Sequence, residues 1–231
     1  MNGVLIGDKH SYRDFGLILS EKTISHPQPK TNSIDIPLRD GTLDITESIT
    51  GDVKYHDRKI TLTFSVVDAR RTWVSKISEI SNYLHGKRLK LIFDDDLAFY
   101  YIGRVSINQW QTNKSIGKLV VEVVAEPYKY DITSSSVDWE WDSLDFNSGI
   151  INETGGLTVN GRLTVELICR KKRSTPTFIA SADMTVTFGG KTYNLRAGSR
   201  KVYEIILGEG INELTFTGKG TISIDYTGGS L

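Results

Sequence analysis

The sequence predicts a mainly β protein of two domains with a single α-helix. Runs in which apolar and polar residues alternate recur along the chain, as they do on half-buried strands. Only residues 69–85 repeat their apolar side chains at helical spacing. A polar run, 131–136, separates that mixed region from a stretch with no helical pattern. We therefore expect domains at 1–130 and 131–231.

In the first domain, residues 42–67 show the pattern of one long hairpin. Ile60, Leu62, Phe64 and Val66 alternate with polar residues, and so do Leu43, Ile45 and Ile49 around a Thr50–Asp52 turn. The same kind of pattern predicts further strands at 89–93, 99–107 and 118–125.

The predicted helix follows this hairpin. Asp68 is a suitable N-cap, and Gly86 stands where a left-handed residue ends a helix. Trp73 opens the apolar stripe that Ile77, Ile80 and Leu84 continue, so it is the expected anchor of the helix.

The second domain is expected to be an antiparallel β-sandwich. Short alternating runs lie at 163–169, 184–188, 214–216 and 222–226. Glycine pairs at 189–190, 208–210 and 218–220 predict the turns between them.

The composition of the chain argues against several classes of protein. The chain has 231 residues, 28 basic and 28 acidic side chains, and one cysteine. A nucleic-acid binder usually shows a basic excess, and one cysteine forms neither an intrachain disulfide nor a thiolate cluster. No signal peptide or membrane-spanning run is apparent, so we expect a soluble product with no membrane insertion.

Few residues suggest a catalytic or metal-binding site. Asp94, Asp95 and Asp96 could hold a hard cation or supply a carboxylate pair, but adjacent strand residues diverge, which favours an acidic turn. The four histidines are scattered, nucleophile and phosphate-loop motifs are missing, and Cys169 fits as a small mid-strand hydrophobe. The basic run 170–173 is typical of a solvated loop. We expect no catalytic residue, metal or cofactor.

Aromatic residues of the second domain offer one binding alternative. Trp139 and Trp141 fall on the same face of a strand, where indoles stack on sugars or, more commonly, fill a core. With Tyr193 they are the candidates for contact with a host-wall polysaccharide if this domain is a carbohydrate-binding module.

Six short motifs follow one another along the chain: Ser11-Tyr12-Arg13-Asp14-Phe15-Gly16-Leu17, Ile36-Pro37-Leu38-Arg39-Asp40-Gly41-Thr42-Leu43-Asp44, Tyr55-His56-Asp57-Arg58-Lys59-Ile60, Tyr83-Leu84-His85-Gly86-Lys87, Tyr100-Tyr101-Ile102-Gly103-Arg104 and Pro127-Tyr128-Lys129-Tyr130. In order and spacing they resemble the distal tail protein (Dit) family of long-tailed phages and prophages of Gram-positive hosts. The likeness is dense over residues 1–130 and looser beyond, at 210–212 and 220–226.

The resemblance implies a structural protein, with no enzymatic activity, at the tip of the virion tail after assembly in the host cytoplasm. It implies a homo-oligomeric ring, usually a hexamer, as the hub of a siphovirus baseplate that serves host adsorption. The expected partners are the tail tube protein, a tail-tip or tail-associated lysin protein and a receptor-binding protein. It also implies a tail-tube-like β-sandwich or split barrel with one helix as the ring-forming first domain. The second domain is then a galectin-like or carbohydrate-module-like docking platform.

A channel through such a ring should pass DNA without binding it, because each neutralised phosphate adds affinity. Zero net charge is compatible with that, and Asp44, Thr46 and Ser48 on the polar face of the expected hairpin are candidates to face the lumen.

Overall fold

The computed structural model describes residues 3–67, 73–112, 116–132 and 154–231, which form two compact units. The first unit holds residues 1–95, 101–127 and 231, and the second holds 96–100 and 128–230. Both are built from antiparallel strands, and α1 (Trp73–Leu84) is the one α-helix in the described ranges. The mainly β fold class with a single helix is thus confirmed. No helix in these ranges is long and apolar enough to cross a membrane.

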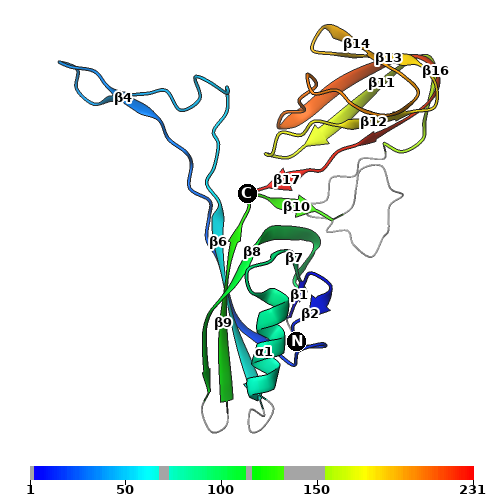
Figure 1. Cartoon of the computed structure of the whole chain (residues 1–231). Coiled ribbons are helices and arrows are strands. Elements are labelled where there is room, and N and C mark those ends of the chain that lie inside the picture. The colour runs from blue at the N-terminus through cyan, green and yellow to red at the C-terminus, as the bar shows by residue number, and fades with distance from the viewer. Residues whose placement is uncertain (1–2, 68–72, 113–115, 133–153) are drawn as a thin grey trace. The chain divides into compact units, whose positions relative to one another are not determined.

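The first unit is organised on a sheet whose strand order is β2-β1-β7-β8-β9-β6-β3. Next to the edge strand β3, β6 pairs antiparallel with β3 on one side and with β9 on the other; Figure 1 labels β6 and β9. The strands of this sheet are β1 (Val4–Ile6), β2 (Lys9–His10), β3 (Ile18–Ile24), β6 (Arg58–Val67), β7 (Arg88–Phe93), β8 (Asp96–Thr112) and β9 (Ile116–Ala125).

One face of this sheet carries the core. The predicted alternation in β6 is confirmed, since its four apolar residues are buried with the helix stripe that begins at Trp73. Trp73 packs so closely on Gly117 of β9 that a Cβ there would lie 3.1 Å from the indole. Gly86 ends the helix with φ 79°, as expected. Asp68, the predicted N-cap, lies outside the described residues.

The expected hairpin over 42–67 is wrong. Residues Thr42–Asp44 form β5, which pairs with β4 (Ser33–Asp35), whereas β6 pairs with β3 and β9. Both halves alternate, but Leu43 and Ile49 are exposed and contribute nothing to the core. Alternation alone does not identify the partner of a strand. The short β4–β5 pair lies outside the large sheet, but residues 42–44 show the same alternation as a strand that pairs with β6.

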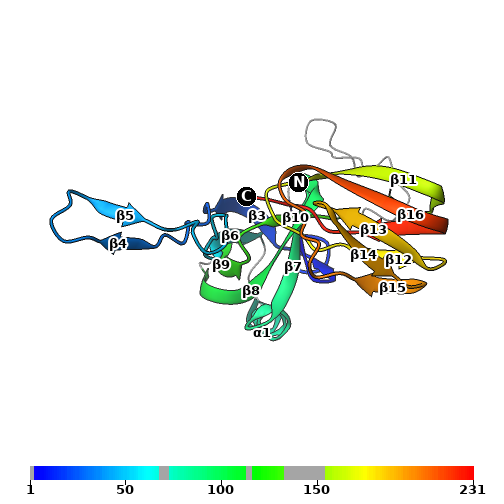
Figure 2. The same ribbon diagram turned by 90° about the horizontal axis from the view of Figure 1, so that it is seen from above.

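The second unit is a six-stranded antiparallel sheet that curls around its own core (Figure 2). The long strand β16 (Gly210–Asp225) pairs with β11 (Leu157–Cys169) over the whole of β11. On its other side β16 pairs first with β13 and then with β12. The remaining strands are β12 (Thr177–Ala180), β13 (Met184–Phe188), β14 (Lys191–Leu195) and β15 (Gly198–Lys201), and β10 (Lys129–Asp131) pairs with β17 (Gly229–Ser230) and with β8.

Of the glycine runs predicted to be turns, 189–190 forms a turn and 218–220 lies within a strand. Gly189 and Gly190 join β13 to β14 with φ of 54° and 76°, as in a two-residue hairpin turn. The turn expected at 218–220 is wrong, because these residues continue β16 opposite β11. Gly218 is there for space, since a Cβ would lie 2.6 Å from the Cβ of Met184.

Candidate functional site

The acidic run forms the predicted turn between β7 and β8, and its carboxylates diverge. Asp94 lies 3.1 Å from Nε2 of His10, Asp95 lies 2.6 Å from Nζ of Lys22, and Asp96 lies 2.9 Å from the Nζ of Lys129. Each carboxylate therefore has its own cationic or imidazole partner. Within the described ranges no three His, Cys, Asp or Glu side chains gather as a metal site would require.

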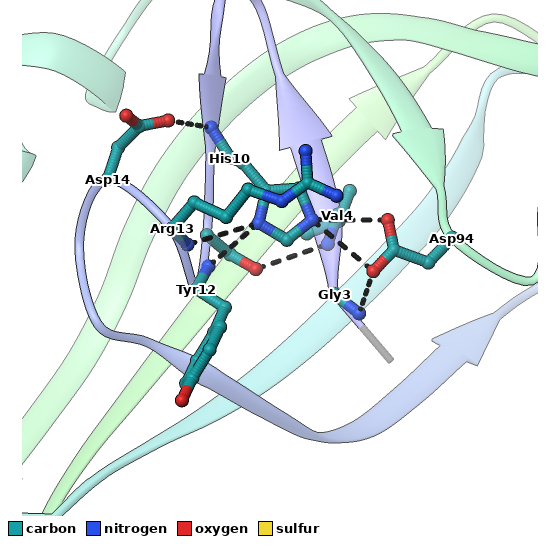
Figure 3. Close-up of polar contacts among 8 residues, drawn as sticks. Gly3, Val4, His10, Tyr12, Arg13, Asp14 and Asp94 are labelled. Atoms are coloured by element: carbon teal, nitrogen blue, oxygen red, sulfur yellow. Dashed lines mark hydrogen bonds and ion pairs between the residues drawn. The ribbon is translucent and has the colours of Figure 1, made fainter. Parts of the chain in front are cut away.

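His10 is buried and hydrogen-bonded through both ring nitrogens (Figure 3). Its Nδ1 accepts the backbone N–H groups of Tyr12 and Arg13 at 3.1 and 3.2 Å, so the ring proton lies on Nε2 and is donated to Asp94. The backbone N–H of His10 donates to Asp14 at 2.6 Å. Both ring nitrogens are occupied, and the imidazole acts as a structural cross-link.

Asp94 completes this cluster by accepting the N–H of Gly3 at 2.8 Å. Partial burial by itself would raise the pKa of Asp94, but the hydrogen bonds from His10 and Gly3, with the charge of Arg13, outweigh it and lower that pKa. The cluster ties the start of the chain to the β7–β8 turn and presents no free reactive group.

The three lumen candidates lie on an extended excursion between β3 and β6, which we call the arm (residues 28–57). The backbone N–H of Thr46 donates to Asp44 at 2.9 Å, and hydrogen bonds from Thr46 lower the pKa of Asp44. Asp44, Thr46 and Ser48 share the lining of an open groove of about 690 Å³ within the arm with Pro29, Glu47 and Val53. Their lumen role stays a prediction, although the hairpin that suggested it is not formed.

The arm is the feature that the sequence analysis missed. None of its residues is buried, and Leu38 and Ile49 are almost wholly exposed. Leu38 occupies the third position of a turn closed by the bond from Arg39 N–H to Ile36 C=O at 3.2 Å, with φ 67°. A leucine in that left-handed conformation costs about 1–2 kcal/mol. Pro29 and Pro37, which cannot donate to a β-ladder, were the available signal.

Of the three sugar-binding candidates, the structure describes Tyr193 alone. Trp139 and Trp141 lie outside the described residues. Tyr193 on β14 is half-buried and packs against the core of the second unit, opposite Val186. A sugar-contacting role for these residues stays a prediction.

Cys169 is a core residue, as expected, although it is the last residue of β11 and does not lie in mid-strand. It is buried, and desolvation raises the pKa of its thiol to about 11. The basic run that follows is a loop, in which Arg170 lies 3.2 Å from Asp131 and Lys171 lies 2.9 Å from Glu209.

The chain folds as two antiparallel β units, and the two most exposed hydrophobic residues among those described, Leu38 and Ile49, lie on an extended arm. The same fold is found in the crystal structure of the SPP1 Dit (gp 19.1) protein, described as a paradigm of the hub adsorption apparatus in Gram-positive infecting phages. The two chains agree with a TM-score of 0.66 over 100% of each, at 14% sequence identity. The resemblance found in the sequence is thereby confirmed at the level of the fold. No protein-family model matches the chain, and no curated protein does.

Proposed function

We propose that this chain is a structural phage tail-tip protein that assembles into a ring, expected to be a hexamer. The ring joins the tail tube to the tail-tip and receptor-binding apparatus and leaves a channel for DNA. The fold shared with SPP1 Dit supports this role. The observation that carries it is the arm.

An arm without a core is not explained by the stability of the isolated chain. Ordering backbone costs about 1–2 kcal/mol per residue, and burial of apolar side chains normally offsets that cost. Residues 28–57 bury none, and their internal support is the short β4–β5 pair, the Pro29–Tyr55 bridge and a few local hydrogen bonds. A neighbouring subunit supplies the missing burial. Because head-to-tail contacts that close by rotation form rings, each arm then has one equivalent neighbour.

The face of the first sheet opposite the helix suits a channel wall. It presents Thr61, Thr63 and Ser65 of β6 beside Glu122 of β9, and the Nζ of Lys59 lies 2.8 Å from Glu122. Asn108 donates to the same carboxylate at 2.8 Å. Charges on this face are mixed and partly neutralised in pairs, so passing phosphates find no continuous basic track.

The second unit is proposed as the outward docking platform. Its described residues form a buried core of their own, and exposed side chains on its strands, such as Ile179 and Ile211, are available to other tail proteins.

The arm can be tested by shortening it. Replacing residues 31–53 with a short Gly-Ser linker keeps the Pro29–Tyr55 bridge and the 2.7 Å bond between Lys30 N–H and Lys54 C=O. We expect wild-type protein to form rings in negative-stain images and in light scattering at tens of micromolar, and the shortened protein to be a folded monomer with an unchanged melting temperature.

Point variants provide the matched control. Leu38→Ser with Ile49→Ser should weaken the ring, whereas Leu97→Ser, at an exposed leucine of β8, should not. A wild-type protein that is only monomeric, or a shortened protein of unchanged oligomeric mass, would overturn the proposal.

A further inference from the structure

The solvent face of the β11–β16 ribbon carries two adjacent cross-strand pairs that do not favour the free protein. Glu166 lies directly opposite Glu213, and Ile168 lies directly opposite Ile211. Their neighbours in each strand, such as Leu167 and Leu214, point into the core, so these four side chains share the opposite face. Figures 1 and 2 show the two strands side by side.

Both pairs are exposed and lack compensation. Like charges directly opposite each other on a sheet are destabilising, and neither glutamate has an ion pair or hydrogen bond among the described residues. The isoleucines are 44% and 69% exposed. The next pair on the same face, Thr164 and Thr215, is neutral, and its hydroxyls lie 3.2 Å apart.

The two cations that directly follow β11 are engaged elsewhere. Lys171 binds Glu209, and Arg170 lies beside Asp131. Arg162 is on the same face, but it lies four residues along the strand from Glu166, roughly 13 Å away. The two carboxylates thus form a local negative site with an apolar neighbour.

The backbone under this surface is fixed. The buried side chain of Asn212 accepts the N–H of Gly208 at 2.9 Å and donates to the carbonyls of Gly208 and Gly210 at 2.8 and 3.1 Å. The hydroxyl of Tyr226 donates to the carbonyl of Ile168 at 3.1 Å. A surface held in this way loses little entropy when a partner binds.

We infer that Glu166, Glu213, Ile168 and Ile211 form a docking surface for a segment of another protein that presents a lysine or arginine beside an aliphatic side chain. The cation lies between the carboxylates and relieves their repulsion, and the aliphatic group covers the isoleucines. A negative surface disfavours nucleic acid and anionic lipid. The inference rests on the proposed function in that it assigns a face to the docking platform.

The test uses the full chain and peptides of random sequence. A displayed library is selected on immobilised wild-type protein, and the enriched peptides are synthesised and titrated by fluorescence polarisation. We expect them to contain Lys or Arg next to an aliphatic residue and to bind more weakly as salt increases. Glu166→Gln with Glu213→Gln should weaken binding at least about tenfold. Ile168→Thr with Ile211→Thr should also weaken it, and Glu204→Gln, at another exposed carboxylate of this unit, should not.

Several outcomes would overturn the inference. They are a failure to enrich any peptide, enrichment of acidic peptides, and equal binding to the double glutamine variant. Calcium chloride that binds wild-type protein and displaces the peptides would instead identify a cation site.

Two further measurements separate this inference from the ring and from a purely structural role. The oligomeric mass measured by light scattering should be the same for these variants as for wild-type protein. If wild-type protein forms no ring, the proposed function fails but the peptide-binding result still holds. Glu213→Gln should raise the melting temperature by removing the repulsion, whereas a lower one would show that the pair serves the fold.

Discussion

Replacing Asp94 by asparagine tests whether the cluster around His10 holds the N-terminal strands in place. The carboxylate accepts two hydrogen bonds, from Gly3 N–H at 2.8 Å and from His10 Nε2 at 3.1 Å. A hydrogen bond to a charged group contributes about 1.5–3 kcal/mol and a neutral one about 0.5–1.5, so each bond loses about 1 kcal/mol. Because the Asp94 side chain is 30% exposed, we expect a total loss of about 1–2 kcal/mol in the free energy of unfolding of the first unit.

Urea denaturation measures this loss. In a background with Trp139→Phe and Trp141→Phe, tryptophan emission comes from Trp73 and Trp110, both in the first unit. A carboxyl whose pKa is lowered by folding contributes stability above its unfolded pKa, about 3.9, and loses it as pH falls through the folded value. The difference between wild type and Asp94→Asn should therefore be full at pH 6 and shrink in strong acid.

The adjacent turn residue is the control. Asp95 is more exposed and pairs with Lys22 at the surface, so Asp95→Asn should cost about 0–1 kcal/mol. If Asp94→Asn unfolds at the same urea concentration as wild type at pH 6, or if its deficit does not change with pH, the assignment of a stabilising charged cluster is wrong.

Three other outcomes are expected. Asp95→Ala should change stability by less than about 1 kcal/mol, and calcium should leave the melting temperature unchanged; a shift of several degrees with calcium would contradict the separate ion pairs. Trp73→Ala should cost about 3–5 kcal/mol in urea denaturation, since the indole is buried against Gly117; a cost near zero would refute its role as the helix anchor. Cys169, with a pKa of about 11, should not react with a thiol reagent at pH 8 until the protein is unfolded, and rapid reaction in the native state would show that its core is open.

Local patterns in the sequence were sufficient to predict where strands and the helix lie, but not which strands pair with each other. Residues 60–66 alternate because β6 has one face on the core, and Trp73 to Leu84 repeat at helical spacing because α1 packs on that face. Residues 42–44 pair with the nearby residues 33–35 and not with β6, and alternation does not encode which of several strands is the partner. The Gly-Lys-Gly run at 218–220 predicted a turn. The structure shows instead that a side chain at residue 218 would collide with Met184 of the neighbouring strand.

The candidate site divides in the same way. The divergence of Asp94, Asp95 and Asp96 follows from strand geometry and was predictable. The binding of Asp94 to His10, and the opposition of Glu166 to Glu213, depend on tertiary pairing and were not. The arm was missed because its few apolar residues alternate with polar ones, as residues on a half-buried strand do. In the structure Leu38, Leu43 and Ile49 are exposed.

The position of β16 in the chain has a consequence for synthesis on the ribosome. This strand is the shared partner of β11, β12 and β13, yet it is made after all of them. At roughly 5–20 residues per second, β11 waits roughly 3 to 11 s for its partner, with its ladder groups unsatisfied on that side. The second unit therefore cannot fold progressively as it is synthesised. Polypeptides interrupted before residue 210 leave those strands without their shared neighbour, and such products should be prone to aggregation and rapid proteolysis.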